Sequence, residues 1–185
     1  MTLSLFIVVL GGRSLKSNIE IHDVRWVLGK SIEDTFPELR EQWLGKKRGL
    51  HIDSYKCIKY VDGYEIVISK SKEDNLINRK KEDLSLWFVN LGGYDPKKMY
   101  EDHEFTLIVA KKAVDAKKKA KKEWQSNLKN KHNDDYSGIK NFEQVDDLHS
   151  IKKIKSWEIN LIKDSEGRSQ KLIPDWYGYK RIDKF

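Results

Sequence analysis

Four of the five histidines in this 185-residue chain recur at one spacing, and each has a carboxylate close by in sequence. An offset of 81 residues relates the two members of each histidine pair. The resulting His–carboxylate pairs are Glu20 with His22, His51 with Asp53, Glu101 with His103, and His132 with Asp134. Residues two apart on an extended strand point to the same side, so each pair presents an imidazole and a carboxylate together. This combination suits a divalent metal ion or a phosphate- or hydroxyl-bearing ligand.

Two sets of candidate site residues follow from this pattern. We predict metal ligands at His51, Asp53, His132 and Asp134. We predict ligand-binding residues at Glu20, His22, Glu101 and His103, together with the glycine pairs Gly11–Gly12 and Gly92–Gly93. A glycine turn can offer backbone N–H groups to an anion. The simpler interpretation of each glycine pair is a structural turn, because neither has the spacing of a Walker or dinucleotide motif.

The histidines also have a structural interpretation, which the sequence favours over a metal site. His22 and His103 are in register with apolar strand positions, and a neighbouring carboxylate can hold an imidazole in one tautomer. In a β-grasp sheet the second and third strands are opposite edges, about 14 Å apart at about 4.8 Å per strand. The two His–carboxylate pairs of one copy would then meet only across the interface between copies.

The sequence of the elements that must position these residues occurs twice in the chain. Leu3–Gly12 reads LSLFIVVLGG and Leu84–Gly93 reads LSLWFVNLGG, and the 81-residue offset continues without a gap through the following segment. A fixed long period indicates a duplicated structural unit. The fold class we predict is α+β, with two tandem ββαββ repeats that are β-grasp-like or roll-like. Each repeat is expected to form a four-stranded sheet with one helix, and the two to pack about a pseudo-two-fold axis.

In the first copy, apolar patterning predicts strands at Leu3–Leu10 and His22–Leu28. Ser31 and Asp34 indicate a helix start, and Ile32, Phe36, Leu39 and Trp43 then follow at helical spacing. Leu50–Val61 and Tyr64–Ser69 are predicted to form a hairpin around Asp62–Gly63. In the second copy a polar insertion, roughly Asn141–Lys153, is expected to replace that turn before the strand resumes at Trp157.

The domain boundaries that we predict are residues 1–70 for the first repeat, 71–83 for a charged linker and 84–163 for the second repeat. Residues 164–185 are expected to dock on the core as an edge strand or strap. The helix Lys111–Lys131 is rich in lysine, which permits nucleic-acid binding. A solvated basic face is the better interpretation, because Trp124 matches Trp43 and is expected to face the sheet.

Composition favours a folded protein with a heavily charged surface and a formal net charge of +7. The single cysteine, Cys57, excludes an internal disulfide and indicates a reducing compartment. The apolar start follows no basic segment and is too short to span a bilayer, so we expect no signal peptide and no membrane partner. The predicted location is cytoplasmic. The predicted assembly is a monomer with an internal pseudo-dimer, or a weak homo-oligomer.

The segments LFIVVLGG, IEIHDV, SIEDTFPELREQW, LHIDSYK and VDGYEI resemble a family known as domain of unknown function 1543. The resemblance covers the first copy almost completely. The second copy keeps the overall sequence pattern but lacks the Asp-Gly turn and the intact I-x-H-D motif. The resemblance implies a bacterial, cytoplasmic protein with one or two copies of the domain, and it implies no activity.

Three functions remain open from sequence, and the identity of any cofactor is unknown. The leading one is a non-enzymatic module that binds a small ligand or a protein. The second is an enzyme that depends on a metal or a phosphometabolite and uses the paired His and carboxylate residues. The third is nucleic-acid binding through the lysine-rich helix. Whether the protein is an enzyme is left open by the sequence.

Overall fold

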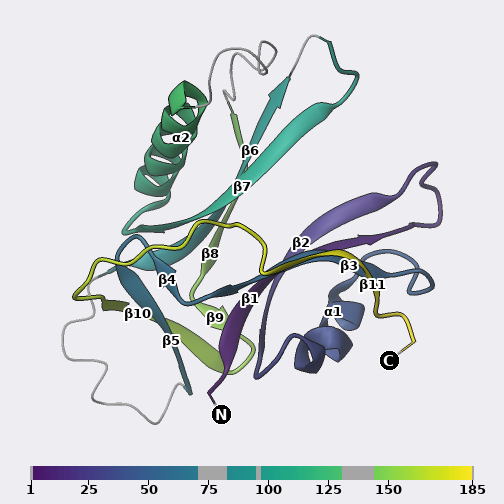
Figure 1. The fold of residues 1–185 in the computed structure, drawn as a ribbon, viewed down its shortest axis with the longest axis horizontal. Helices are drawn as coiled ribbons and strands as arrows, with labels where there is room; N and C mark the ends of the chain where they lie inside the picture. Colours follow the sequence, from purple (N-terminus) through teal and green to yellow (C-terminus); the bar gives the residue numbers. More distant parts are fainter. Residues whose placement is uncertain (1, 71–82, 95–96, 131–143, 185) are drawn as a thin grey trace. The chain divides into compact units, whose positions relative to one another are not determined.

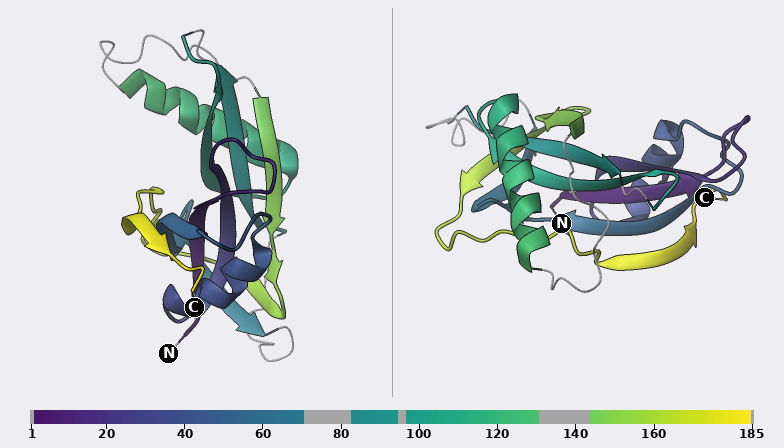
Figure 2. Two further views of the ribbon diagram at one scale, coloured as in Figure 1. Left: turned by 90° about the vertical axis from the view of Figure 1, so that its right-hand side faces the viewer. Right: turned by 90° about the horizontal axis from the view of Figure 1, so that it is seen from above.

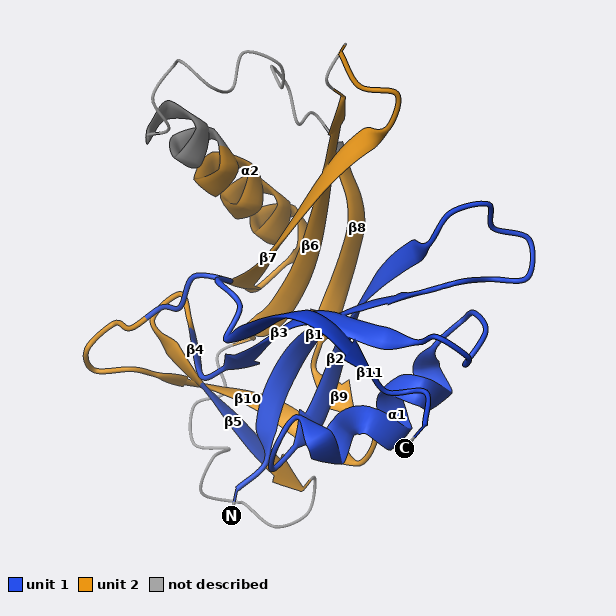
Figure 3. Ribbon diagram, turned by 45° about the vertical axis from the view of Figure 1, so that its right-hand side comes forward, with its two compact units in different colours: residues 1–60, 66–68, 169–185 blue, residues 61–65, 69–168 orange. Residues whose placement is uncertain are grey.

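The computed structural model describes residues 2–70, 83–94, 97–130 and 144–184. The protein is α+β, with two α-helices and mostly antiparallel sheets in the described part. The chain divides into two compact units (Figure 3). Unit 1 comprises residues 1–60, 66–68 and 169–185, and unit 2 comprises residues 61–65 and 69–168.

Unit 1 contains a four-stranded antiparallel sheet (Figure 1). Its strands are β1 (Ser4–Gly12), β2 (Ile21–Gly29), β3 (His51–Ile58) and β11 (Trp176–Arg181), in the order β11-β3-β1-β2. Strand β1 lies between two other strands, and seven of its nine residues are buried. A nearly continuous apolar run is what such a central position requires.

A short helical segment covers one face of this sheet. It consists of a 3-10 turn (Glu33–Thr35) and α1 (Phe36–Gln42). The predicted helix start is confirmed, because the Asp34 carboxylate accepts hydrogen bonds from the N–H groups of Lys30 and Ser31. The predicted apolar positions Ile32, Phe36, Leu39 and Trp43 are buried in one cluster with Phe6, Val8 and Leu10 of β1. Gly11 alternates with these residues along β1 and therefore lies on the opposite face.

Unit 2 repeats this arrangement around a three-stranded sheet. Its elements are β6 (Ser85–Tyr94), β7 (Glu101–Ala110), α2 (Ala113–Asn130) and β8 (Gln144–Ile151), with strand order β7-β6-β8. Figure 2 shows α2 lying across one face of these strands. Ala116 and Ala120 are buried against the sheet, and Trp124 packs against the same cluster. The prediction that Trp124 faces the sheet is confirmed.

The remaining strands form a separate sheet. These strands are β4 (Tyr60–Val61), β5 (Tyr64–Lys70), β9 (Lys153–Ile154) and β10 (Trp157–Lys163), in the order β4-β5-β10-β9. Asp62 has φ of 52° and Gly63 has φ of 80°, which confirms the predicted Asp-Gly turn. Lys155 has φ of 54° at the matching turn between β9 and β10.

The observed strand order differs from the predicted β-grasp order. Strand β1 pairs with both β2 and β3, so only one strand separates those two, and β11 covers the outer side of β3. The returning strand β5 belongs to the separate sheet, and the outer place beside β3 is taken by β11 (Figure 2, right). The physical reason is a break at Lys59, where the predicted strand Leu50–Val61 divides into β3 and β4. The pseudo-two-fold packing and the proposed domain boundaries stay predictions.

The third strand of the second copy also begins later than predicted. Gly11 pairs with His51 in the first copy, and Gly92 pairs with Gln144 in the second. The offset between β3 and β8 is therefore 93 residues, from His51 to Gln144, and no longer 81. Most of the segment predicted to be a polar insertion is strand β8. His132 and Asp134, which the shorter offset had selected, lie outside the described residues.

Within the described residues, no helix combines the length and the apolar character that crossing a membrane requires.

Candidate functional site

Gly11 lies at the centre of the candidate site in unit 1. It is the β1 residue paired with His22 on β2 and with His51 on β3. A methyl group on Gly11 would overlap His51 Nε2 and would lie 2.8 Å from Glu20 Oε1 and 2.9 Å from Asp53 Oδ2. The absence of a side chain at this position therefore lets residues from both neighbouring strands meet above β1.

The predicted turns at the glycine pairs are wrong. Gly11 and Gly12 are the last residues of β1, and Gly92 and Gly93 lie within β6. The strands continue because a glycine leaves room for side chains of the neighbouring strands. A methyl group on Gly12 would instead meet the Trp43 ring, so Gly12 does not belong to the site. Gly93 follows Gly92 along β6, and alternation places it on the other face.

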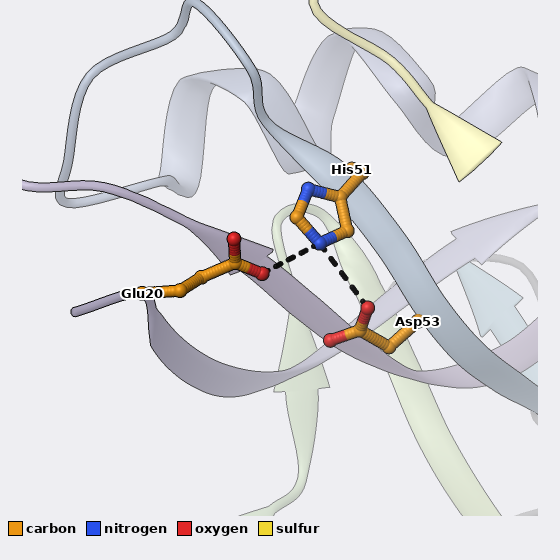
Figure 4. A group of neighbouring side chains, drawn as sticks. All are labelled: Glu20, His51 and Asp53. Atoms are coloured by element: carbon orange, nitrogen blue, oxygen red, sulfur yellow. Dashed lines mark ion pairs between the residues drawn. The ribbon is translucent and has the colours of Figure 1, made fainter. Parts of the chain in front are cut away.

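The two His–carboxylate pairs of the first copy meet within unit 1, and Figure 4 shows three of their four residues, Glu20, His51 and Asp53. His51 Nε2 lies 2.8 Å from Glu20 Oε1 and 3.2 Å from Asp53 Oδ1. Ligand atoms of Glu20, His51 and Asp53 all lie within 4.8 Å of one another. His22 Nε2 adjoins the group, 3.3 Å from Asp53 Oδ2 and 3.6 Å from Glu20 Oε1. The expected separation of about 14 Å is wrong because β2 and β3 both flank β1, about 10 Å apart at two strand spacings.

His51 is held in one orientation by a backbone carbonyl. Its Nδ1 lies 2.8 Å from the Gly49 oxygen, and its side chain is only 1% exposed. A carbonyl oxygen only accepts hydrogen bonds, so Nδ1 carries a proton and donates it. Nε2 then faces two carboxylate oxygens, which are also acceptors. A proton or a metal ion between these atoms would join the three groups, because a bare lone pair there would repel both carboxylates.

The carboxyl-terminal segment packs against His51 and holds the loop that precedes it. The Tyr179 ring packs on the His51 ring with centroids 4.0 Å apart. The Gly49 N–H donates to Asp183 Oδ2 at 2.8 Å, and Asp183 pairs with Arg181 at 2.6 Å. The hydrogen bond from Arg181 holds the pKa of Asp183 well below its usual range. The loop that orients His51 is therefore anchored by a carboxylate that stays charged.

A β-bulge brings Asp53 to the site. Leu10 pairs with Ile52 and Val9 pairs with Ser54, which leaves Asp53 as the extra residue of β3. A bulge re-aims a side chain without disturbing the pairing on either side of it. Asp53 can therefore join His51 on the face that carries Gly11.

Unit 2 contains a related group of side chains. Ligand atoms of Glu101, His103 and Asp146 lie within 4.8 Å of one another. His103 Nδ1 lies 3.4 Å from Asp146 Oδ2, and His103 Nε2 lies 3.9 Å from Glu101 Oε2. Gly92 pairs with His103, and a methyl group on Gly92 would overlap the carboxylates of Asp146 and Glu101. Glycine again makes room for the group.

Sequence reasoning missed Asp146. Asn90 pairs with Asp147 and Leu91 with Val145, so Asp146 is the extra residue of a bulge in β8, as Asp53 is in β3. The signal that would have found it is the 93-residue offset, which already relates Tyr64 to Trp157 and extends back to relate Asp53 to Asp146. Gln144 occupies the strand position that His51 occupies in the first copy.

The lysine-rich helix gains no specific support as a nucleic-acid interface. Lys117, Lys118 and Lys122 are exposed on α2. Trp124 packs toward the sheet and so is not presented for stacking on bases. Nucleic-acid binding stays a prediction.

The fold and these side chains together define a class of protein. It is a duplicated α+β protein in which the central strand of each unit, β1 or β6, carries a glycine that is surrounded by histidine and carboxylate groups. The chain belongs to the family described as Domain of Unknown Function (DUF1543), which matches residues 17–68 and again residues 98–148. The resemblance seen in the sequence and the presence of two copies are thereby confirmed.

One solved structure extends this likeness over nearly the whole chain. The protein is similar to protein Il1583 from Idiomarina loihiensis, whose crystal structure it matches with 31% sequence identity and a TM-score of 0.71. The match covers 97% of this chain and 98% of the other. No curated protein matches the chain.

Proposed function

We propose that the protein binds a divalent transition metal ion of the zinc type in unit 1, through Glu20, His51, Asp53 and His22. The observation that carries this proposal is the environment of His51. Its Nδ1 donates to Gly49 while its Nε2 faces the carboxylates of Glu20 and Asp53. Histidines that bind metals characteristically donate their other ring N–H to a backbone carbonyl or carboxylate.

The distances support a metal ion between these groups. Zinc lies about 2.0–2.2 Å from histidine nitrogen and carboxylate oxygen, so ligand atoms in a tetrahedral site are about 3.3–3.5 Å apart. The observed separations from His51 Nε2 are 2.8 Å and 3.2 Å, and those from His22 Nε2 are 3.3 Å and 3.6 Å. Small rotations of exposed side chains bridge the difference, since the His22 side chain is 57% exposed. The two carboxylates also balance the charge of a divalent cation.

Binding is favoured over catalysis if His22 rotates inward as a fourth ligand, because in the structure the group with ligand atoms within 4.8 Å of one another consists of Glu20, His51 and Asp53. Four side chains fill a tetrahedral zinc site, whereas catalytic zinc sites keep one position for water or substrate. The proposal thus specifies the leading expectation from sequence, a non-enzymatic module for a small ligand, with a metal ion as that ligand. We place this function in a bacterial cytoplasm, as the sequence predicts.

The test is zinc binding by the full-length protein without an affinity tag. The protein is stripped of metal and titrated with Zn²⁺ by calorimetry, and the protein as purified is analysed for bound elements. We expect one tight equivalent that is lost in His51→Ala and in Glu20→Gln with Asp53→Asn. His149→Ala is the matched control, because His149 belongs to neither group, and this variant should bind zinc as the parent does.

Circular dichroism and thermal melting establish that each variant is folded. If the folded parent takes up no zinc, or the His51→Ala protein binds it equally well, the proposal is overturned. A proton shared between His51 and the two carboxylates would then account for the geometry.

A further inference from the structure

We propose a second metal site in unit 2, where Glu101, His103 and Asp146 bind a divalent cation that keeps water in its remaining coordination positions. Nothing in this proposal depends on the zinc site of unit 1, because the residues differ. The two sites have the same origin in the strand pattern but different ligand sets.

The three ligand groups of this site converge on one point. Three ligand atoms lie within 4.8 Å of one another, although their residues are separated along the chain and come from two strands on opposite sides of β6. The carboxylates of Asp146 and Glu101 both reach the space above Gly92 that a methyl group would fill. A cation between two carboxylates so close would offset their mutual repulsion.

A neighbouring hydroxyl group orients one of the ligands. The Tyr94 hydroxyl donates to Glu101 Oε2 at 3.1 Å, which leaves Oε1 directed toward Gly92. Hydrogen-bonding partners of this kind hold ligand side chains in the orientation that a metal requires.

The site of unit 2 lacks the buried histidine of unit 1. Unit 1 has a buried histidine opposite its central glycine, and unit 2 has Gln144 at that strand position. The three ligands of unit 2 are one nitrogen and two oxygens, and the His103 side chain is 50% exposed. Three protein ligands at an exposed position leave places for water. Carboxylate and water ligands suit Mn²⁺ and Mg²⁺, whereas imidazole suits zinc.

The experiment uses Mn²⁺ as the probe on the full-length protein, after one equivalent of Zn²⁺ has been added. Electron paramagnetic resonance of free Mn²⁺ gives the affinity, and the relaxation rate of water protons reports water on the bound ion. We expect micromolar binding of one Mn²⁺ with an enhanced water relaxation rate. Binding should be lost in Asp146→Asn combined with Glu101→Gln.

Control variants separate this site from the first. His51→Ala, titrated with Mn²⁺ without added zinc, should keep the Mn²⁺ site and its effect on water relaxation, and His149→Ala should keep both metal sites. The isosteric variants are checked for folding by their thermal melts. Millimolar Mn²⁺ binding only, binding that survives in the folded Asp146→Asn, Glu101→Gln protein, or bound Mn²⁺ without enhanced water relaxation would each overturn the proposal.

Discussion

Asp53 and Asp146 are each the extra residue of a β-bulge at the same place in the two repeats. In β3 the bulge lies between the partners of Leu10 and Val9, and in β8 between the partners of Leu91 and Asn90. Each bulge places a carboxylate beside the glycine of the neighbouring strand. Both repeats therefore use a β-bulge to bring a carboxylate next to the glycine of the central strand, although the other residues of the two sites differ.

Replacing Gly11 by alanine should abolish zinc binding without removing any ligand. The added methyl group would overlap His51 Nε2 and crowd both carboxylates. Overpacking of this kind costs about 1–3 kcal/mol in free energy of unfolding. Calorimetry with Zn²⁺ measures the affinity and urea denaturation the stability.

Gly12→Ala is the matched control for that variant. Its methyl group would meet Trp43 on the other face of β1, so it should lower stability and leave zinc affinity unchanged. Equal zinc affinity in Gly11→Ala and the parent would show that the space above Gly11 is not the binding site.

Replacing Gln144 by histidine should strengthen the metal site of unit 2. Strand pairing places residue 144 opposite Gly92, as His51 lies opposite Gly11. The gain in Zn²⁺ affinity should be at least about 10-fold. Loss of a residue that only hydrogen-bonds to a metal ligand already lowers metal affinity by about 10–100-fold, and a ligand itself should contribute no less. A titration in the His51→Ala background isolates this site. An unchanged affinity would mean that the 93-residue correspondence does not extend to ligand geometry.

Replacing Asp183 by alanine should weaken zinc binding by about 10–100-fold, because Asp183 anchors Gly49 and Gly49 orients His51. Asp175→Ala is the matched control. It removes a comparable carboxylate that pairs with Lys56 and accepts from the Cys57 N–H at the far end of β3. A similar loss of zinc affinity in both variants would point to general destabilisation of β3.

Zinc should raise the melting temperature of the parent and leave that of His51→Ala unchanged. A ligand that binds only the folded state stabilises it by about 2.7 kcal/mol when its free concentration is 100 times Kd. Scanning calorimetry with and without a chelator measures this shift. A chelator that leaves the zinc-loaded parent at its original melting temperature would contradict specific binding.

Asp164 should make stability depend on pH in the acid range. Hydrogen bonds from Arg168 lower the pKa of Asp164 to about 2, whereas an aspartate in an unfolded chain titrates near about 4. Because the folded pKa is the lower one, the stabilisation is present above about pH 4 and is lost as the pH falls toward 2. Asp164→Asn should therefore lower the urea midpoint at pH 7, and its difference from the parent should shrink below pH 4.

Glu166→Gln serves as the control for this pH effect. Glu166 is largely exposed and lies 3.4 Å from Arg168 Nε, so its replacement should change the urea midpoint little at any pH. A difference between Asp164→Asn and the parent that persists undiminished at pH 2 would contradict the assigned cause.

Local features of this fold were predictable from sequence because they depend on neighbouring residues. The contact between Ser31 and Asp34 and the inward face of Ile32, Phe36, Leu39 and Trp43 follow from helix geometry. Alternation along a strand also predicted that His51 and Asp53 share a side, although the structure adds a bulge at Asp53. The duplication was predictable because the two copies have recognisably similar sequences.

The assembly of the site was not predictable in the same way. It depends on β1 pairing with both β2 and β3, and strand order is set by contacts between distant segments. The longer connection before β8 shifted the true counterpart of Asp53 to Asp146, which a constant offset does not find. Tyr179 and Asp183 reach His51 and Gly49 from more than a hundred residues away, and no spacing rule links them.

The bulge has one more consequence, for how such a gene can change. Without Asp53, Ile52 and Ser54 would be consecutive and would still pair with Leu10 and Val9 in a regular ladder. The sheet does not need this residue, and the same holds for Asp146 in β8. Loss of a single codon would thus remove either carboxylate and leave the strand pairing on both sides of it intact. Backbone pairing alone therefore does not select for keeping Asp53 or Asp146.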